Sequence, residues 1–141
     1  MRFEDASDQD GFTRVLKQEL LADLRINAPQ GINSQINLAR YSPDNDLIAG
    51  VSGTTSYGWL RVNMLWVASP HRGTGIGRQI MEKAFEQSVA RACHSVWLET
   101  SSQTACAFYT ALGFEKFGAL TNPSNAPCFS HQRRFLRRAL F

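Results

Sequence analysis

The sequence predicts a domain of the α/β class, with a mixed sheet that has an antiparallel front half followed by one parallel crossover. Two segments of strand character flank a turn-forming stretch at 43–46, and a strand, a helix and a second strand follow one another over 58–100. Strand character then returns near the C-terminus. At 141 residues the chain is long enough to bury a core without metal or disulfide support, so we expect a single domain over residues 1–141.

The first expected element is a helix over residues 11–26. Its apolar residues recur at spacings of three or four positions, which places them on one helical face and predicts one buried stripe. These residues are Phe12, Val15, Leu16, Leu20 and Leu24. The segment NAPQG at 27–31 ends the helix.

A β-hairpin and a central strand follow. The segments INLARYS and LIAGVSGTT flank PDND at 43–46, which has the turn chemistry typical of a connection between antiparallel strands. The run GWLRVNMLWV at 58–67 is rich in aromatic and β-branched residues and predicts a central strand. This strand ends at Ser69-Pro70, because proline cannot continue a ladder of hydrogen bonds.

The second half of the chain predicts a parallel βαβ unit and two further strands. One helical face collects Ile76, Ile80, Met81, Ala84, Phe85 and Val89, and HSVWLET follows as a short apolar strand. Strand, helix and strand in succession imply a parallel crossover. A short helix marked by Ala105, Phe108, Tyr109 and Leu112 then ends at Gly113. FEKFGA resumes strand character, residues 121–127 form a loop, and CFSHQRRFLRR is the final strand.

Composition and cysteine usage exclude several classes of protein and site. The chain is 43% hydrophobic and 19% charged, with no apolar run near the roughly 18 residues that span a bilayer and no charged-then-apolar leader. We therefore expect a soluble cytoplasmic protein without a membrane partner. Cys93, Cys106 and Cys128 are widely spaced and form no C-x-x-C pair, which predicts free thiols and no metal site.

A basic cluster, RRFLRR, lies near the C-terminus and holds Arg133, Arg134, Arg137 and Arg138. Such a cluster could meet nucleic acid or an anionic ligand. The alternative, which we favour, is a solvated strand face or a sheet edge protected by charge. A formal net charge of +3 is modest for a nucleic-acid binder and no recognition helix is evident, so we expect no nucleic-acid partner.

The stretch SPHRGTGIGRQIM, residues 69–81, places Gly73, Gly75 and Gly77 at alternate positions behind Arg72 and directly ahead of the expected helix. A helix N-terminus offers unpaired N–H groups and a partial positive charge, and glycines before it let a phosphate approach the main chain. The stretch therefore predicts a phosphate or pyrophosphate loop, although tight strand-to-helix turns also use glycine without a ligand. The spacing excludes a G-x-G-x-x-G fingerprint, and the missing lysine excludes a Walker loop.

This loop resembles motif A of the GCN5-related N-acetyltransferase (GNAT) superfamily, R/Q-x-x-G-x-G/A. Arg72, Gly75 and Gly77 fill that pattern. The stretch SSQTACAFYTALGFEKFG is similar to motif B of the same superfamily, N-x-x-A-x-x-L/F-Y-x-x-x-G-F, with Ser102 in place of the asparagine and Ala105, Phe108, Tyr109, Gly113 and Phe114 matching. The two motifs stand in the family's order, and the resemblance covers about residues 50–118.

The resemblance implies a GNAT-like acyl-CoA N-acyltransferase fold, acetyl-coenzyme A as donor and, usually, a primary amine as acceptor. In this fold the sheet opens into a V at the strand before motif A, and the free backbone groups of that strand pair with the pantetheine arm of the donor. When the family's contacts are carried over by position, pantetheine would contact the main chain of Leu65, Trp66 and Val67. The pyrophosphate would meet Arg72, Gly73, Thr74, Gly75, Ile76 and Gly77, and Ser102 and Tyr109 would complete the donor site.

The family's chemistry, direct attack of an uncharged amine on the thioester, assigns roles to three residues. The Val67 N–H would stabilise the oxyanion. Tyr109 would supply a proton or a hydrogen bond to the departing thiolate, its alternative being a core residue beside Phe108 and Leu112. Many relatives have a glutamate that acts as the general base on the strand before motif A. Asn63 occupies that position in this chain, and its neutral amide cannot take a proton. Glu99 is then the best remaining carboxylate for the role of general base.

Other candidates for the acceptor side carry less weight. His71 and His131 are alternative bases, each more typical of a surface residue, and an acceptor that arrives as free amine needs no base. Tyr57, Trp59 and Trp66 could wall an acceptor pocket, although most aromatic residues in strands belong to the core. Most relatives begin with a strand, but MRFEDASD is too short and acidic to predict one, so we expect the first strand to be missing or vestigial.

The sequence thus favours an acetyl-CoA-dependent N-acetyltransferase that acts on a small-molecule amine in a ternary complex. A non-catalytic acyl-CoA sensor, an acetyltransferase of protein amines and a basic nucleic-acid binder are the alternatives. The final strand and the loop at 121–127 could also support a homodimer.

Overall fold

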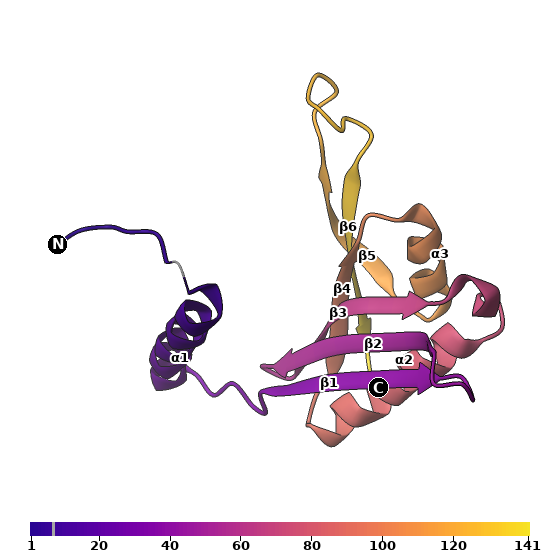
Figure 1. The fold of residues 1–141 in the computed structure, drawn as a ribbon, viewed down its shortest axis with the longest axis horizontal. Coiled ribbons are helices and arrows are strands. Elements are labelled where there is room, and N and C mark those ends of the chain that lie inside the picture. Colours follow the sequence, from indigo (N-terminus) through magenta and orange to yellow (C-terminus); the bar gives the residue numbers. More distant parts are fainter. Residues whose placement is uncertain (7) are drawn as a thin grey trace. The chain divides into compact units, whose positions relative to one another are not determined.

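The computed structural model describes residues 1–6 and 8–141, which form two compact units, Met1–Gln30 and Gly31–Phe141 (Figure 1). The first unit holds one helix, and the second holds all the strands. The expectation that residues 1–141 form a single domain stays a prediction.

The first unit is built around helix α1 (Gln9–Asn27), which agrees with the helix predicted over 11–26. The Asp8 side chain caps it by accepting a hydrogen bond of 3.1 Å from the Gly11 N–H. Within this unit the apolar stripe is exposed, with Phe12 50% and Leu20 55% exposed, because the described part of the unit contains no second element that covers them. The burial of the stripe therefore stays a prediction. The described residues before Asp8 form no strand, and no described helix of the chain is long and apolar enough to cross a membrane.

The second unit is built on a six-stranded sheet with the strand order β1-β2-β3-β4-β6-β5. Its strands are β1 (Ser34–Tyr41), β2 (Leu47–Ser56), β3 (Trp59–Val67), β4 (Ser95–Thr100), β5 (Glu115–Thr121) and β6 (Gln132–Ala139). β3 and β4 are parallel, and every other neighbouring pair is antiparallel. The predicted α/β class, with an antiparallel front half and a parallel crossover, is confirmed.

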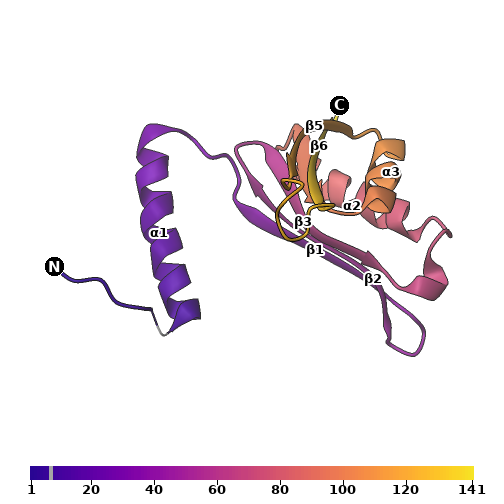
Figure 2. The ribbon, with the colours of Figure 1, turned by 90° about the horizontal axis from the view of Figure 1, so that it is seen from above.

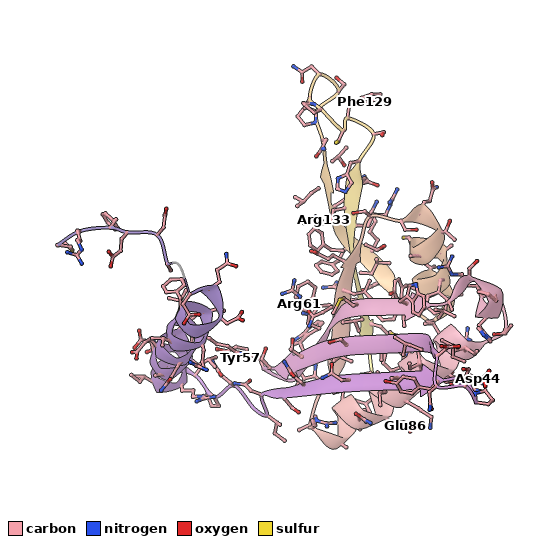
Figure 3. The ribbon with its side chains drawn as sticks, viewed as in Figure 1. Asp44, Tyr57, Arg61, Glu86, Phe129 and Arg133 are labelled. Carbon is pink, nitrogen blue, oxygen red and sulfur yellow. The ribbon has the colours of Figure 1, made fainter. Side chains whose placement is uncertain are left out.

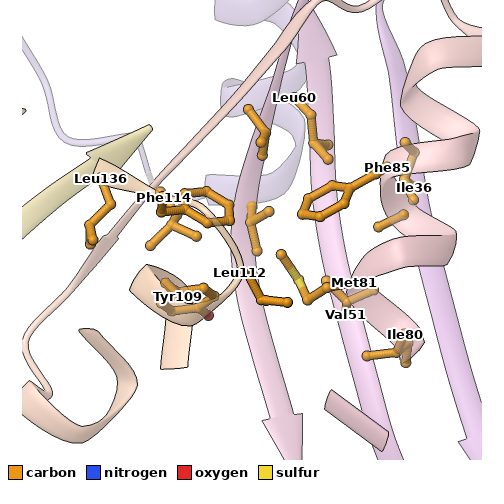
Figure 4. Packing of buried hydrophobic residues seen from close by; sticks show 14 of the residues in the cluster. Ile36, Val51, Leu60, Ile80, Met81, Phe85, Tyr109, Leu112, Phe114 and Leu136 are labelled. Carbon is orange, nitrogen blue, oxygen red and sulfur yellow. The ribbon is translucent and has the colours of Figure 1, made fainter. Parts of the chain in front are cut away.

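Helices α2 (Ile76–Ala90) and α3 (Gln103–Ala111) cover one face of this sheet, the inner face (Figure 2). The core lies between them and the strands, where Met81, Leu98 and Leu136 are at most 1% exposed (Figure 4). Val89, expected on the buried face of α2, is 39% exposed. Ser88 is buried in the last turn instead, with its hydroxyl donating to the Phe85 carbonyl at 2.8 Å.

The basic cluster lies on β6, which is an interior strand. β6 pairs with β4 on one side and β5 on the other, so the interpretation of a charge-protected sheet edge is wrong. Leu136 faces the core, and strand alternation therefore turns Arg134 and Arg138 to the inner face and Arg133 and Arg137 to the opposite, outer face. β6 begins at Gln132, later than the predicted strand.

The sheet opens between β3 and β4. These strands pair only at Trp59–Ser95, Leu60–Val96 and Arg61–Trp97. β3 then continues to Val67, and β4 continues to Thr100 with β6 as its neighbour. Beyond Arg61 the two parallel strands diverge, which forms the V that the family resemblance implies.

A β-bulge lies at the start of this V. Ser52 of β2 pairs with Met64 and Gly53 pairs with Val62, which leaves Asn63 as the extra residue of β3. A bulge reverses which side chains face inward: Leu60 and Val62 are buried before it, and Leu65 and Val67 pack on the core after it.

Candidate functional site

Gly73 and Gly75 shape the loop that joins β3 to α2. Their φ angles are +75° and +88°, a left-handed conformation that favours glycine. A Cβ atom added at either position would meet nothing within 4 Å, so conformation and not crowding requires glycine there. α2 begins at Ile76 without a side-chain cap, and the N–H groups of its first turn therefore stay available to a ligand.

Gly77 serves packing instead. A Cβ atom there would lie 3.2 Å from Cζ of Phe108 and 3.6 Å from Cγ2 of Val67. The third glycine thus lets α3 and the end of β3 approach the start of α2 closely.

Arg72 and Thr74 hold the loop in place. The Arg72 Nε donates a hydrogen bond of 2.8 Å to the Val67 carbonyl, and the Thr74 hydroxyl donates to the His71 carbonyl at 2.5 Å. The arginine therefore ties the loop to the last residue of β3 and brings a positive charge to the mouth of the V.

The main chain of β3 presents two residues to the V. The Ala68 N–H donates to the Ile48 carbonyl of the β2 side at 2.8 Å. Backbone groups alternate in direction along a strand, so those of Val67 and Leu65 point away from β2, where β4 has diverged. The backbone of Trp66 points toward β2 and its side chain is 48% exposed, which excludes Trp66 from the predicted main-chain contact.

A cavity of about 790 Å³ joins the loop, the end of β3 and α3. Of the predicted donor-site residues, it is lined by Leu65, Val67, Arg72, Gly73, Gly75, Gly77, Ser102 and Tyr109. The predicted residues that do not line it are Trp66, Thr74, Ile76 and Glu99.

The cavity also contains residues that were not predicted for the donor site: His71, Arg78, Thr104, Ala105, Phe108 and Ala111. Thr104, Phe108 and Ala111 recur at spacings of four and three, so helical periodicity could have identified them. Arg78 follows the last glycine, in the first turn of α2.

Ser102 caps the second helix that points at this cavity. Its hydroxyl accepts a hydrogen bond of 3.1 Å from the Ala105 N–H. The N-terminal ends of α2 and α3 thus both border the cavity, and both carry the partial positive charge of a helix N-terminus.

Tyr109 belongs to the core and to the cavity at once. It is 7% exposed, and its ring lies edge-on to Phe108 and Phe114 at centroid distances of 5.2 and 5.5 Å. Figure 4 shows Tyr109 and Phe114 in the core. Burial raises the pKa of its phenol to about 12. No buried side-chain polar atom of the described residues lacks a partner, and none of their hydrogen bonds involves the Tyr109 hydroxyl, so this hydroxyl reaches the cavity.

Glu99 lies across the sheet from Tyr109. Its neighbour Leu98 packs in the core with Tyr109, so Glu99 projects from the outer face, where its carboxylate lies 3.8 Å from the Arg133 guanidinium. Of the two alternative bases, His71 lines the cavity, and His131 Nε2 lies 2.8 Å from the Ser101 hydroxyl.

The outer face has a cavity of its own, of about 530 Å³. It is lined by Ser56, Tyr57, Trp59, Trp97, Phe117, Phe135 and Arg137. Tyr57 and Trp59, named as candidate walls of an acceptor pocket, are therefore together there, and Trp66 is elsewhere. Cys93, Cys106 and Cys128 are free thiols, and the described residues contain no cluster of three or more metal-binding side chains.

Comparison with known proteins points to one family. The model of the acetyltransferase (GNAT) family matches residues 5–114. The acetyltransferase Atu2258 of Agrobacterium fabrum is 33% identical over 116 residues, which is 82% of this chain and 84% of that protein.

Two solved structures show the same fold. A crystal structure assigned as an acetyltransferase from Agrobacterium tumefaciens has a TM-score of 0.82 at 24% identity and covers 99% of this chain and 98% of its own. An aminoglycoside 6′-N-acetyltransferase complexed with coenzyme A has a TM-score of 0.64 at 18% identity and covers 76% of this chain and 73% of its own.

Proposed function

Because the chain belongs to the GNAT family of acetyltransferases and is an acetyl-CoA-dependent N-acetyltransferase, we propose that it acetylates the primary amine of a small molecule by direct attack in a ternary complex. The observation that carries this proposal is a single cavity that unites an uncapped helix N-terminus, the outward main chain of Leu65 with the Val67 N–H, and the Tyr109 hydroxyl.

The residues of the loop fit the diphosphate of coenzyme A. The space around Gly73 and Gly75 is open, and the N–H groups of the first turn of α2 lack a side-chain cap. Arg72 adds a full positive charge while it holds the Val67 carbonyl, and the outward main chain of Leu65 and the Val67 N–H offer the pairing that an extended amide-containing arm requires. Bound there, acetyl-CoA supplies the thioester.

In the proposed mechanism, Val67 and Tyr109 act on the two ends of the thioester. The Val67 N–H donates to the carbonyl oxygen as it gains negative charge. Tyr109 donates a hydrogen bond to the sulfur as the C–S bond breaks and the N–C bond forms. Since a thiol of ordinary pKa near 8.5 is more acidic than a phenol with a pKa of about 12, Tyr109 keeps its proton and stabilises the thiolate as a donor.

Glu99 takes the proton that the attacking amine loses. It projects from the outer face where β3 and β4 diverge, which lets an amine reach it from the side opposite the donor cavity. The acceptor amine therefore enters the V from the outer face.

The test measures donor binding and chemistry separately. We expect acetyl-CoA to bind the protein in calorimetry, and free thiol to appear when small amines are added. Gly75→Ala should weaken binding about tenfold or more, because alanine disfavours the left-handed conformation that aims the N–H groups. Tyr109→Phe should bind acetyl-CoA but lower kcat about a hundredfold.

Gly50→Ala is the matched control, because a Cβ atom there makes only an ordinary contact, 3.6 Å from the Leu38 carbonyl oxygen. Absence of acetyl-CoA binding, or transfer only to protein amines, would refute the proposal. If Gly75→Ala lowers stability without changing affinity, the glycine only forms a bend.

A further inference from the structure

We propose that the acceptor is an amine that carries a planar aromatic group and a nearby carboxylate, and that the outer face of the sheet binds it with the ring in the aromatic cavity and the carboxylate at Arg61. This inference rests on the proposed function and names the substrate class of the same site.

The aromatic cavity has the form of a site for a flat ring. Its floor consists of Trp59, Trp97, Phe117 and Phe135 on β3, β4, β5 and β6, with Phe117 and Phe135 at a centroid distance of 6.1 Å. A volume of about 530 Å³ lies within the range of pockets that bind small molecules. Rings gain stacking energy on such a floor beyond the burial of their area.

The cavity lies beside the reaction centre. Trp97 and Glu99 alternate with the buried Val96 and Leu98, so both project from the outer face of β4. Trp97 pairs with Arg61 at the last position before β3 and β4 diverge, and Glu99 comes two residues later. A ring that packs in the cavity beside Trp97 would therefore place an amine two or three bonds away near the opening of the V.

The charges of the outer face favour a carboxylate as the second recognised group of the acceptor. Arg133 pairs with Glu99 at 3.8 Å, and Arg137 pairs with Glu115 at 3.1 Å while lying over the ring of Phe117. Arg61 lies over the Trp97 ring at 4.9 Å and takes part in none of the ion pairs of the described residues.

The outer face thus carries one cation that its own carboxylates do not compensate. Figure 3 shows Arg61 and Arg133 extending from the sheet on the side away from α3. An acceptor with several positive charges would be repelled there, whereas a carboxylate would form a charge-assisted hydrogen bond with the guanidinium. The amine at Glu99, the carboxylate at Arg61 and the ring in the cavity beside Trp97 together describe an aromatic α-amino acid or a close analogue.

The experiment compares three acceptors: L-phenylalanine, phenethylamine, which lacks the carboxylate, and L-alanine, which lacks the ring. We expect the wild type to have its highest kcat/KM for L-phenylalanine. Arg61→Gln should lower kcat/KM for L-phenylalanine tenfold or more and leave kcat/KM for phenethylamine within twofold of the wild-type value. Trp97→Leu should raise KM for both ring-bearing amines and leave the affinity for acetyl-CoA unchanged.

A binding measurement makes the test independent of turnover. N-Acetyl-L-phenylalanine cannot be acetylated again, and we expect it to quench the tryptophan fluorescence of the wild type. The quenching should be weak in Arg61→Gln. Lys83→Gln, which removes an exposed charge of α2, is the control and should be quenched as the wild type is. Melting temperatures of the variants confirm that they fold.

Two results would overturn the inference while leaving the proposed function intact: acetyl transfer that ignores ring and carboxylate, or an equal loss for L-phenylalanine and phenethylamine in Arg61→Gln. A Trp97→Leu variant that dissociates a dimer and keeps its KM would assign this face to a second copy and also overturn it. Absence of acetyl-CoA binding would instead refute the proposed function itself.

Discussion

Tyr109 shows how one residue serves stability and chemistry together. Its ring packs between Phe108 and Phe114, and its hydroxyl reaches the donor cavity. The same burial that secures the ring raises the pKa of the phenol to about 12, so the hydroxyl holds its proton well above neutral pH. A donor that keeps its proton is suited to stabilising a leaving thiolate.

The raised pKa of Tyr109 predicts a loss of stability at high pH. In the unfolded chain the phenol ionises near its ordinary pKa of 10.0, whereas in the folded protein it holds its proton up to about pH 12. The unfolded state therefore binds fewer protons in this window, and the free energy of unfolding falls as pH rises from 10 to 12, by on the order of 2 kcal/mol. Below pH 10 this contribution is fully present.

Urea denaturation of the wild type and Tyr109→Phe at pH 8, 10 and 11.5 checks this effect. We expect the wild type to lose more stability than the variant over the upper interval, since phenylalanine has no proton to release. The difference between the two proteins removes the titration of the other tyrosines and the lysines. Parallel curves would show that the Tyr109 phenol titrates as it does in water.

Among the elements, β3 decides the geometry of the site. The bulge at Asn63 turns Leu65 and Val67 toward the donor cavity and leaves Trp66 outside it. Gly53 is the residue of β2 that makes this bulge possible, because a Cβ atom there would lie 2.7 Å from the Arg61 carbonyl oxygen and 2.9 Å from Cδ1 of Leu60.

Gly53→Ala should therefore lower the free energy of unfolding by about 1–3 kcal/mol and reduce kcat, because overpacking against the backbone shifts β3 at the V. Gly50→Ala, on the same strand, should change stability by less than about 1 kcal/mol. Urea denaturation and thiol release measure the two effects. Equal free energies of unfolding and equal kcat values for the two variants would show that the bulge does not depend on Gly53.

The elements that local patterns define could be predicted from the sequence. The turn residues at 43–46, the apolar periodicity of α2 and the glycine at 113 each act within a few residues of the chain. The bulge could not be predicted, since it depends on the register in which β2 and β3 pair, which leaves Asn63 without a partner. The sequence also did not show that β6 lies between two strands.

The candidate site also has residues that could be predicted from the sequence and residues that could not. Arg72, the glycines and Tyr109 lie in short contiguous motifs, and the structure brings them to one cavity. The aromatic cavity could not be predicted, because its floor takes residues from four strands. Arg61 and Trp97, which carry the acceptor proposal, stand next to each other only through the parallel pairing of β3 and β4.

At the scale of the second unit, the sheet separates two cavities. The donor cavity lies with the helices on the inner face, and the aromatic cavity lies on the outer face. Under the proposals made above, each substrate enters from its own side and reaches the other through the opening between β3 and β4. This arrangement favours a ternary complex over an acetylated enzyme.

The side chains of the donor cavity support the same mechanism. The cavity contains no cysteine, and Ser102 is occupied as the cap of α3. The nearby Cys106 is half-buried on α3 and does not line the cavity. A covalent acetyl-enzyme would require a nucleophile with a neighbouring base, and among the described residues no hydrogen bond joins His71, the imidazole of the cavity, to the hydroxyl of Ser102, Thr104 or Tyr109.

Initial rates at varied acetyl-CoA and amine concentrations should therefore give double-reciprocal lines that intersect, as sequential binding requires. Cys106→Ala should retain activity within about twofold, since the thiol takes no part in transfer. Parallel lines, or acetylated protein detected by mass spectrometry after incubation with acetyl-CoA alone and lost in Cys106→Ala, would instead establish a covalent intermediate. In that case the two faces of the sheet would be used in turn, and the V would carry the acetyl group between two half-reactions.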